Sequence, residues 1–166
     1  MSTLRINLWS GPRNVSTALM YSFAQRADTR VVDEPLYAHY LRVSGADHPG
    51  RADVLSSQDN DGERVVRDVL LAESDKPVLF FKQMAHHLVE LDRSFLKRCR
   101  NVVLTRDPLD MLPSLVNQIA EPTLRDTGYA MQTELVDQLR AIGQAPLVLD
   151  AMEVLLDPRG MLALLC

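Results

Sequence analysis

The segment Leu4–Leu19 constrains the fold of this chain most, because it joins an apolar run, a tight turn and a helix start. Leu4–Trp9 is mostly apolar and predicts a buried strand. Gly11-Pro12 predicts a turn, and Ser16-Thr17 then opens an apolar pattern with helical spacing. The unpaired N–H groups and the dipole of a helix start favour an anion. The segment therefore predicts a phosphate-binding loop.

The candidate binding residues of this loop are consecutive: Gly11, Pro12, Arg13, Asn14, Val15, Ser16 and Thr17. Arg13 contributes a fixed positive charge, and the two hydroxyl groups add donors. The nucleotide loop G-x-x-x-x-G-K-[ST] is not matched, since Ser16, Thr17 and Ala18 replace its second glycine, its lysine and its Mg²⁺-binding hydroxyl. We therefore expect an anion bound without metal. An ordinary turn with an exposed arginine is the alternative for this loop taken alone.

Composition favours a single globular domain. The chain has 166 residues, of which 46% are hydrophobic and 24% charged, enough for one core. A net charge of −4 argues against general binding to nucleic acids or membrane surfaces. No run is long and apolar enough to span a bilayer, and Arg5 lies too close to Trp9 and Pro12 for a signal-peptide core, so we expect the cytoplasm. Cys99 and Cys166 lack metal-ligand spacing.

Strand and helix patterns alternate along the chain, which predicts an α/β fold with a parallel sheet. The expected strands are Leu4–Trp9, Thr29–Asp33, Pro77–Lys82, Asn101–Thr105 and Ala145–Leu149. Helices are expected over Glu63–Glu73, Leu91–Lys97 and Thr123–Ile142, and a short helix is expected after Pro35. Two more helices are expected to begin at Asp107-Pro108 and Asp157-Pro158. The composition of Ser44–Asp61 predicts a loop. The last helix lacks a stop signal, so we expect a fragment or an early-terminated form; a helix packed to its last residue is the alternative.

A second anion site is predicted at the end of the fourth strand. Arg106 directly follows the apolar run Val102–Thr105, and ligands of open α/β sheets bind at the carboxyl ends of strands. Ser114 lies eight residues further, on about the same side of the expected helix. Pro113 would kink that helix toward the ligand, or else the helix is misplaced. The alternatives are an ion pair of Arg106 with a neighbouring aspartate and a solvated serine.

Taken together, the two motifs resemble the sulfotransferase family. Its 5′-phosphosulfate motif has the form P-[KR]-S-G-T-T, and its 3′-phosphate motif is an Arg at a strand end with a Ser eight residues on. The loop is most similar to that of bacterial sulfotransferase-like proteins, S-G-P-R-N-x-S-T, and Leu147–Pro158 is similar to a later strand and helix of the family. Val15 replaces the usual glycine, and a G-x-x-G-x-W-K type segment is absent.

The resemblance implies a fold, a donor and a set of roles. The fold is a three-layer α/β sandwich with a parallel sheet, like that of P-loop nucleoside triphosphate hydrolases. The donor is 3′-phosphoadenosine 5′-phosphosulfate, used without metal. Arg13, Ser16 and Thr17 would hold the 5′-phosphosulfate, and Arg106 and Ser114 the 3′-phosphate.

An acceptor hydroxyl or amine also needs a base. Glu34 is the first candidate for the base, and Lys82 is the first candidate for the acid or for oxyanion support. His86 is the next candidate for the base, ahead of His87. A capping or ion-paired Glu34, and solvated or packed histidines, are the alternatives. The residues that would form the acceptor pocket are expected in Tyr37–Asp61 and Glu121–Tyr129. Tyr37, Tyr40 and Trp9 could stack on a ring, but such side chains are more often core or rim residues.

Three other functions remain open. A P-loop kinase or nucleotide hydrolase would bind ATP with Mg²⁺. A non-catalytic relative would bind nucleotide without turnover. A structural fragment would complete its core by pairing with a second copy as a homodimer. For the sulfotransferase we expect a small-molecule acceptor, and no nucleic-acid or membrane partner.

Overall fold

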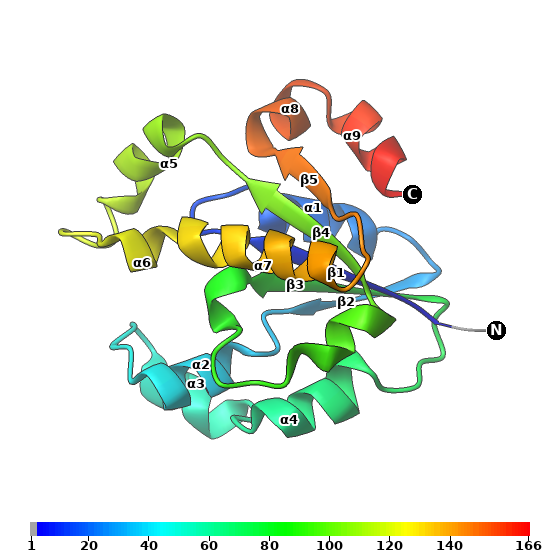
Figure 1. Cartoon of the computed structure of the whole chain (residues 1–166), viewed down its shortest axis with the longest axis horizontal. Coiled ribbons are helices and arrows are strands. Elements are labelled where there is room, and N and C mark those ends of the chain that lie inside the picture. Colours follow the sequence, from blue (N-terminus) through cyan, green and yellow to red (C-terminus); the bar gives the residue numbers. More distant parts are fainter. Residues whose placement is uncertain (1–2) are drawn as a thin grey trace.

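The computed structural model describes residues 3–166, which form a five-stranded parallel sheet between two layers of helices (Figure 1). The strands are β1 (Leu4–Ser10), β2 (Thr29–Asp33), β3 (Val78–Met84), β4 (Arg100–Thr105) and β5 (Leu147–Asp150). Their order in the sheet is β2-β3-β1-β4-β5, so β1 is central and pairs with both β3 and β4. Each expected strand is therefore present, with bounds within two residues of those predicted.

Helices connect the strands and cover both faces. The α-helices are α1 (Ser16–Ala24), α2 (Tyr37–Ser44), α3 (Arg51–Ser57), α4 (Gly62–Val65), α5 (Pro108–Leu115), α6 (Leu124–Thr127), α7 (Tyr129–Ala141), α8 (Ala151–Leu156) and α9 (Pro158–Leu165). A π-helical segment η1 (Val66–Leu70) continues α4, and the 3₁₀ segments are η2 (Ala85–His87) and η3 (Arg93–Arg98). None of the helices in residues 3–166 combines the length and apolarity of a membrane span.

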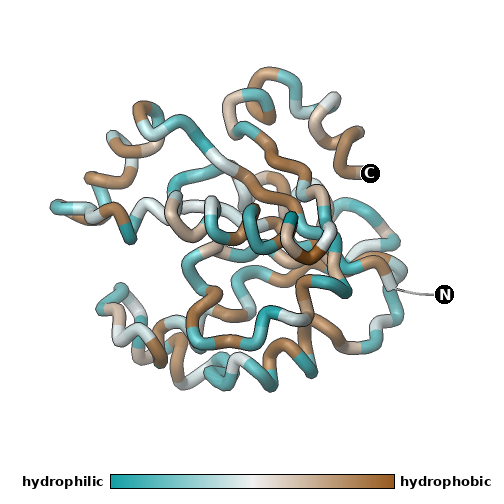
Figure 2. Tube along the Cα trace, in the orientation of Figure 1, coloured by the Kyte–Doolittle hydropathy of each residue, from teal (hydrophilic) through white to brown (hydrophobic). Residues whose placement is uncertain are grey.

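Two hydrophobic clusters lie on opposite faces of the sheet, because alternate strand residues point to opposite sides. Leu8 and Phe80 contribute to the cluster that packs on α1, α8 and α9, whereas Trp9 and Phe81 contribute to the cluster under α4, η1, η3 and α7. Figure 2 shows the hydrophobic residues concentrated along the central strands. Burial of each large apolar side chain contributes about 1.5–3 kcal/mol, so this alternation stabilises the three-layer sandwich.

The second face also encloses a polar group centred on Asn101, which is 5% exposed. The indole Nε1 of Trp9 donates to Asn101 Oδ1 at 2.9 Å, and Asn101 Nδ2 donates to Gln144 Oε1 at 2.9 Å and to the carbonyl of Leu96 at 2.9 Å. Trp9 is 0% exposed. Trp9 is therefore a core residue held by Asn101, as the alternative for this side chain predicted, and it is not available to stack on an acceptor ring.

One predicted helix and one predicted loop differ from the structure. The predicted helix Thr123–Ile142 is broken into α6 and α7 at Gly128, whose φ of 75° is left-handed. The predicted loop Ser44–Asp61 contains the helix α3. By contrast, α5 begins as predicted: the Asp107 carboxylate accepts a hydrogen bond from the Leu109 amide at 2.8 Å, and Pro108 occupies the first turn. Pro113 lies inside α5, so the helix is correctly placed.

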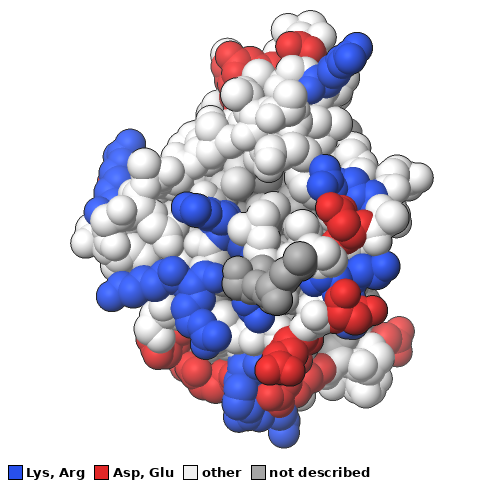
Figure 3. Space-filling view, turned by 90° about the vertical axis from the view of Figure 1, so that its right-hand side faces the viewer, with Lys and Arg blue, Asp and Glu red and all other residues white. Residues whose placement is uncertain are grey.

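All strands run in one direction, so their carboxyl ends meet at one edge of the sheet. The segments after β1, β2, β3 and β4 leave this edge and carry the predicted site residues. The opposite side of the molecule, around the start of β1, exposes basic and acidic side chains near one another (Figure 3). The fold thus brings the predicted motifs to one edge.

Candidate functional site at the carboxyl edge of the sheet

The loop between β1 and α1 is held by close contacts with the junction of α6 and α7. A Cβ placed on Gly11 would lie 3.1 Å from the carbonyl oxygen of Thr127, and one on Gly128 would lie 3.6 Å from the Gly11 Cα. The glycines therefore allow the two backbones to approach. On the other side of the loop, Asn14 Nδ2 donates to the Leu104 carbonyl at 3.0 Å. The loop is thus fixed at both flanks.

Arg13 connects this loop to the second predicted anion site. Its φ of 53° is left-handed, which is uncommon for a residue with a side chain. In this conformation the Arg13 carbonyl accepts a hydrogen bond from Arg106 Nη1 at 2.9 Å, and Arg13 Nε donates to Ser114 Oγ at 2.8 Å. The structure therefore joins three of the predicted phosphate-binding residues in one hydrogen-bonded group. The predicted ion pair of Arg106 with a neighbouring aspartate is absent among residues 3–166. Ser114 is half-buried and accepts a hydrogen bond from Arg13.

A cavity of about 370 Å³ opens above this group. Its lining includes the predicted residues of both motifs, except Val15: Gly11, Pro12, Arg13, Asn14, Ser16, Thr17, Arg106 and Ser114. Val15 instead packs against the core cluster beside α1. The first turn of α1 has no side-chain cap, so its N–H groups remain available to an anion. Nε of Arg106 is buried and has no hydrogen-bond partner among residues 3–166.

Glu34 and Lys82 line the same cavity and contact each other. Lys82 Nζ donates to Glu34 Oε1 at 2.5 Å and forms an ion pair with Asp33 Oδ1 at 2.9 Å. Burial lowers the pKa of Lys82, but the hydrogen bonds and charges of Glu34 and Asp33 outweigh burial and raise it above its usual value. Lys82 is therefore a cation at neutral pH. Glu34 has a φ of 43°, so it and Arg13 are two of the three non-glycine residues with left-handed backbone in residues 3–166.

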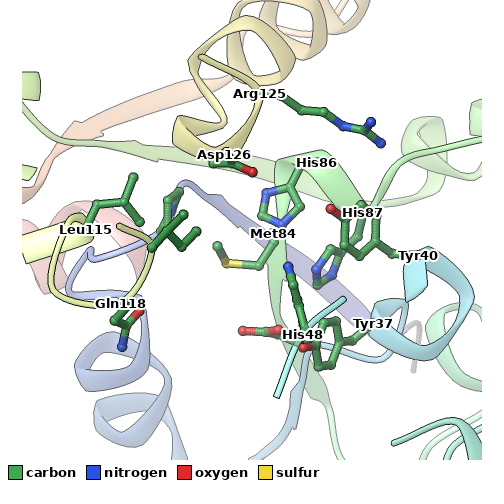
Figure 4. Close-up of a pocket in the computed structure, with 13 residues that line it drawn as sticks. Tyr37, Tyr40, His48, Met84, His86, His87, Leu115, Gln118, Arg125 and Asp126 are labelled. Atoms are coloured by element: carbon green, nitrogen blue, oxygen red, sulfur yellow. Dashed lines mark hydrogen bonds between the residues drawn. The ribbon is translucent and has the colours of Figure 1, made fainter. Parts of the chain in front are cut away.

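A second cavity, of about 240 Å³, adjoins the first. Glu34, Pro12, Met84 and Gln118 line both cavities. One wall of the second cavity is aromatic and is formed by Tyr37, Tyr40, His48, His86 and His87 (Figure 4). Its remaining lining includes Leu115, Ile119, Arg125 and Asp126. The two regions expected to form an acceptor pocket, Tyr37–Asp61 and Glu121–Tyr129, thus both contribute to it.

The aromatic wall is tightly packed around His87. The His87 ring stacks on Tyr37 and Tyr40 with centroid distances of 5.2 and 4.9 Å, and the His86 ring meets it edge-on at 4.7 Å. Burial lowers the pKa of His86 to about 4, and the charges of His48 and Arg125 act in the same direction. Burial also lowers the pKa of His87 well below its usual value. Both rings are therefore neutral at pH 7.

Sequence reasoning did not single out two residues of the second cavity. His48 lies in the segment after α2, and its Nδ1 is 3.0 Å from the Tyr37 hydroxyl. Arg125 lies on α6 at the rim. Neither carries a motif, because both reach the cavity through the folding of connecting segments. Within residues 3–166, no cluster of His, Cys, Asp or Glu has the geometry of a metal site.

Comparison with known proteins gives the same family as the motifs. The family model of the sulfotransferase domain matches residues 4–166. Two relatives from Arabidopsis thaliana are named branched-chain-amino-acid aminotransferase-like protein 1 and 2, and they are 40% and 37% identical to the chain over 162 residues. These matches cover 97% of the chain but only 29% of each relative. The chain therefore spans less than a third of the relatives' length. Because the family model covers residues 4–166, the chain belongs to the sulfotransferase domain family.

Proposed function

We propose that this protein transfers a sulfuryl group from 3′-phosphoadenosine 5′-phosphosulfate to a hydroxyl or amine of a small acceptor. The observation that carries the proposal is the pair of adjoining cavities. One is lined by the arginines and hydroxyls of both phosphate motifs, the other has an aromatic wall, and Glu34 lines both. Such an arrangement suits a reaction between two bound substrates, because catalysis then requires mainly that the acceptor atom be held close to the sulfur and in line with the bond that breaks.

The first cavity fits a nucleotide with phosphate groups at both the 5′ and 3′ positions. The free N–H groups of α1, with Arg13, Ser16 and Thr17, suit the 5′-phosphosulfate. Arg106 and Ser114 line the same cavity, are both hydrogen-bonded to Arg13, and suit the 3′-phosphate. The unpartnered Nε of Arg106 supports this assignment, since a buried donor without an acceptor costs about 1–3 kcal/mol. The absent Walker lysine and Mg²⁺-binding hydroxyl favour this donor over a metal-bound triphosphate.

The chemistry needs a base and a group that stabilises the leaving phosphate. As the acceptor oxygen forms a bond to sulfur, the bond from sulfur to the 5′-phosphate oxygen breaks, and the acceptor proton passes to Glu34. Arg13 stabilises the negative charge that develops on the leaving phosphate. Lys82 remains protonated and donates a hydrogen bond to Glu34. His86 is the second candidate, because it lines only the second cavity whereas Glu34 lines both.

Matched variants of the two candidate bases test this assignment. Glu34→Gln keeps the shape of the side chain but removes its basicity, so we expect kcat to fall by about 10²–10⁴-fold. Binding of adenosine 3′,5′-bisphosphate should change little. His86→Gln should lower kcat by less than about tenfold, since the ring contributes to packing rather than to proton transfer. If His86→Gln lost more activity than Glu34→Gln, the base would be His86.

A further inference from the structure

The second cavity has opposite chemistry at its two ends. Tyr37 and His48 lie at one end in Figure 4, and Arg125 and Asp126 lie at the other, with Met84 between them. Glu34 belongs to the Tyr37 end, because the Tyr37 amide donates to the Glu34 carbonyl at 3.0 Å and both residues line the cavity. A molecule in this cavity therefore meets a carboxylate at one end and a guanidinium at the other.

Arg125 is held in place by the short helix that carries it. The helix α6 begins with a capping box, in which the Thr123 amide and hydroxyl donate to Asp126 Oδ2 at 2.8 and 2.7 Å. It ends at the left-handed Gly128, which contacts Gly11 of the phosphate loop. Both ends of α6 are thus fixed, which places the backbone of Arg125 at the cavity that its side chain lines.

Within the described part of the chain, Arg125 is not bonded to another side chain, although its charge helps to lower the pKa of the neighbouring Asp126. Among residues 3–166 Arg125 makes no ion pair and no side-chain hydrogen bond, whereas the Asp126 carboxylate accepts both Thr123 bonds. The guanidinium acts on the cavity, since it helps to lower the pKa of His86. The rings between the two ends are those of Tyr40, His86 and His87, and burial keeps both imidazoles neutral.

We infer that the acceptor is a small hydroxy acid, with its hydroxyl at Glu34, its carboxylate at Arg125 and a planar or apolar skeleton along the aromatic wall. The inference rests on the proposed function for the direction of the hydroxyl, and it adds the class of acceptor. The guanidinium provides paired N–H donors that match a carboxylate. The cavity of about 240 Å³ limits the acceptor to a small molecule.

Binding of two nearly isosteric probes tests this inference without requiring turnover. The probes are 4-hydroxyphenylacetate and its neutral amide, 4-hydroxyphenylacetamide, titrated into the protein with and without saturating adenosine 3′,5′-bisphosphate. We expect the acid to bind at least tenfold more tightly than the amide. Arg125→Gln should reduce this ratio to about one. Arg140→Gln, an exposed arginine of α7 that pairs with Asp137, should leave the ratio unchanged.

The outcomes separate the inference from the proposed function. Equal binding of acid and amide, failure of both to bind, or a preference that survives Arg125→Gln would each overturn the hydroxy-acid assignment. Failure of the bisphosphate to bind would contradict the proposed donor, while an acid preference measured without nucleotide would still support the role of Arg125. Transfer to neutral phenols as fast as to the acid would retain the sulfotransferase but refute the acceptor class.

Discussion

Replacing Arg106 with glutamine should separate the two phosphate subsites of the donor cavity. The guanidinium has two roles in the structure: Nη1 donates to the Arg13 carbonyl at 2.9 Å, and the buried Nε has no partner. The first role is structural and supports the left-handed Arg13. The second leaves a donor unsatisfied, and we propose that the 3′-phosphate accepts its hydrogen bond. The substitution therefore affects nucleotides with and without that phosphate differently.

The expected sizes follow from the two kinds of hydrogen bond. Loss of a charge-assisted bond to a phosphate costs about 1.5–3 kcal/mol, which weakens adenosine 3′,5′-bisphosphate about 10–150-fold. Loss of the bond to the Arg13 carbonyl costs about 0.5–1.5 kcal/mol at most, because the loop is also held by Asn14 and Gly11. Adenosine 5′-phosphate should therefore weaken by less than about tenfold.

Calorimetric titration of both nucleotides into the wild type, Arg106→Gln and Ser114→Ala measures these losses. Ser114→Ala removes the hydroxyl that accepts from Arg13 Nε, so it should also affect the bisphosphate more than the monophosphate. Arg140→Gln is the control for loss of an exposed arginine. Equal losses for the two nucleotides in Arg106→Gln would refute the 3′-phosphate assignment.

Three further predictions concern stability. The pKa of His86 is about 4 in the folded protein against a usual 6.5, so the protein takes up a proton on unfolding between these pH values. The free energy of unfolding is therefore highest above pH 6.5 and falls toward pH 4, by about 2 kcal/mol at pH 5. Urea unfolding of His86→Gln should not show this loss. Asn101→Leu should lower the free energy of unfolding by about 2–4 kcal/mol, because it leaves buried partners such as the Trp9 indole N–H unsatisfied. Gly128→Ala and Gly143→Ala should each cost about 1–2 kcal/mol for a left-handed alanine, but only Gly128→Ala should also weaken nucleotide binding.

Each of these predictions has a contrary result. An unchanged pH dependence in His86→Gln would assign the acid sensitivity to other groups. A neutral Asn101→Leu variant would show that the buried amide contributes no net stability. Equal nucleotide binding by the two alanine variants would show that the contact between Gly128 and Gly11 does not position the phosphate loop.

The strands and the turn between β1 and α1 could be predicted because their signals are local. Apolar runs ending in Gly11-Pro12 or Asp107-Pro108 mark the ends of β1 and β4, and parallel strands bring such ends to one edge. Arg106 and Ser114 are predicted from a strand end, an eight-residue spacing and the family resemblance, and the structure connects both to Arg13. These features depend on neighbours in sequence and on one rule of topology.

The errors and omissions arise where distant segments meet. Gly128 is one glycine in a helical pattern, but it has a left-handed φ that ends α6 and it lies near Gly11. A tryptophan can lie at a surface or in a core. Trp9 lies in the core, where Asn101, which is far along the chain, accepts a hydrogen bond from its indole N–H. Arg125 and His48 reach the second cavity from connecting segments without any motif. Such contacts are properties of the tertiary structure, so no window of sequence contains them.

The most direct test of the proposed donor site is a titration with adenosine 3′,5′-bisphosphate, compared with ATP, each with and without Mg²⁺. We predict tight binding of the bisphosphate that Mg²⁺ does not change and that ATP does not match, since the loop lacks the groups that hold a metal-bound triphosphate. Binding of ATP that requires Mg²⁺ would indicate a kinase or hydrolase. If neither nucleotide bound, the group formed by Arg13, Arg106 and Ser114 would not be a donor site, and the account would be contradicted.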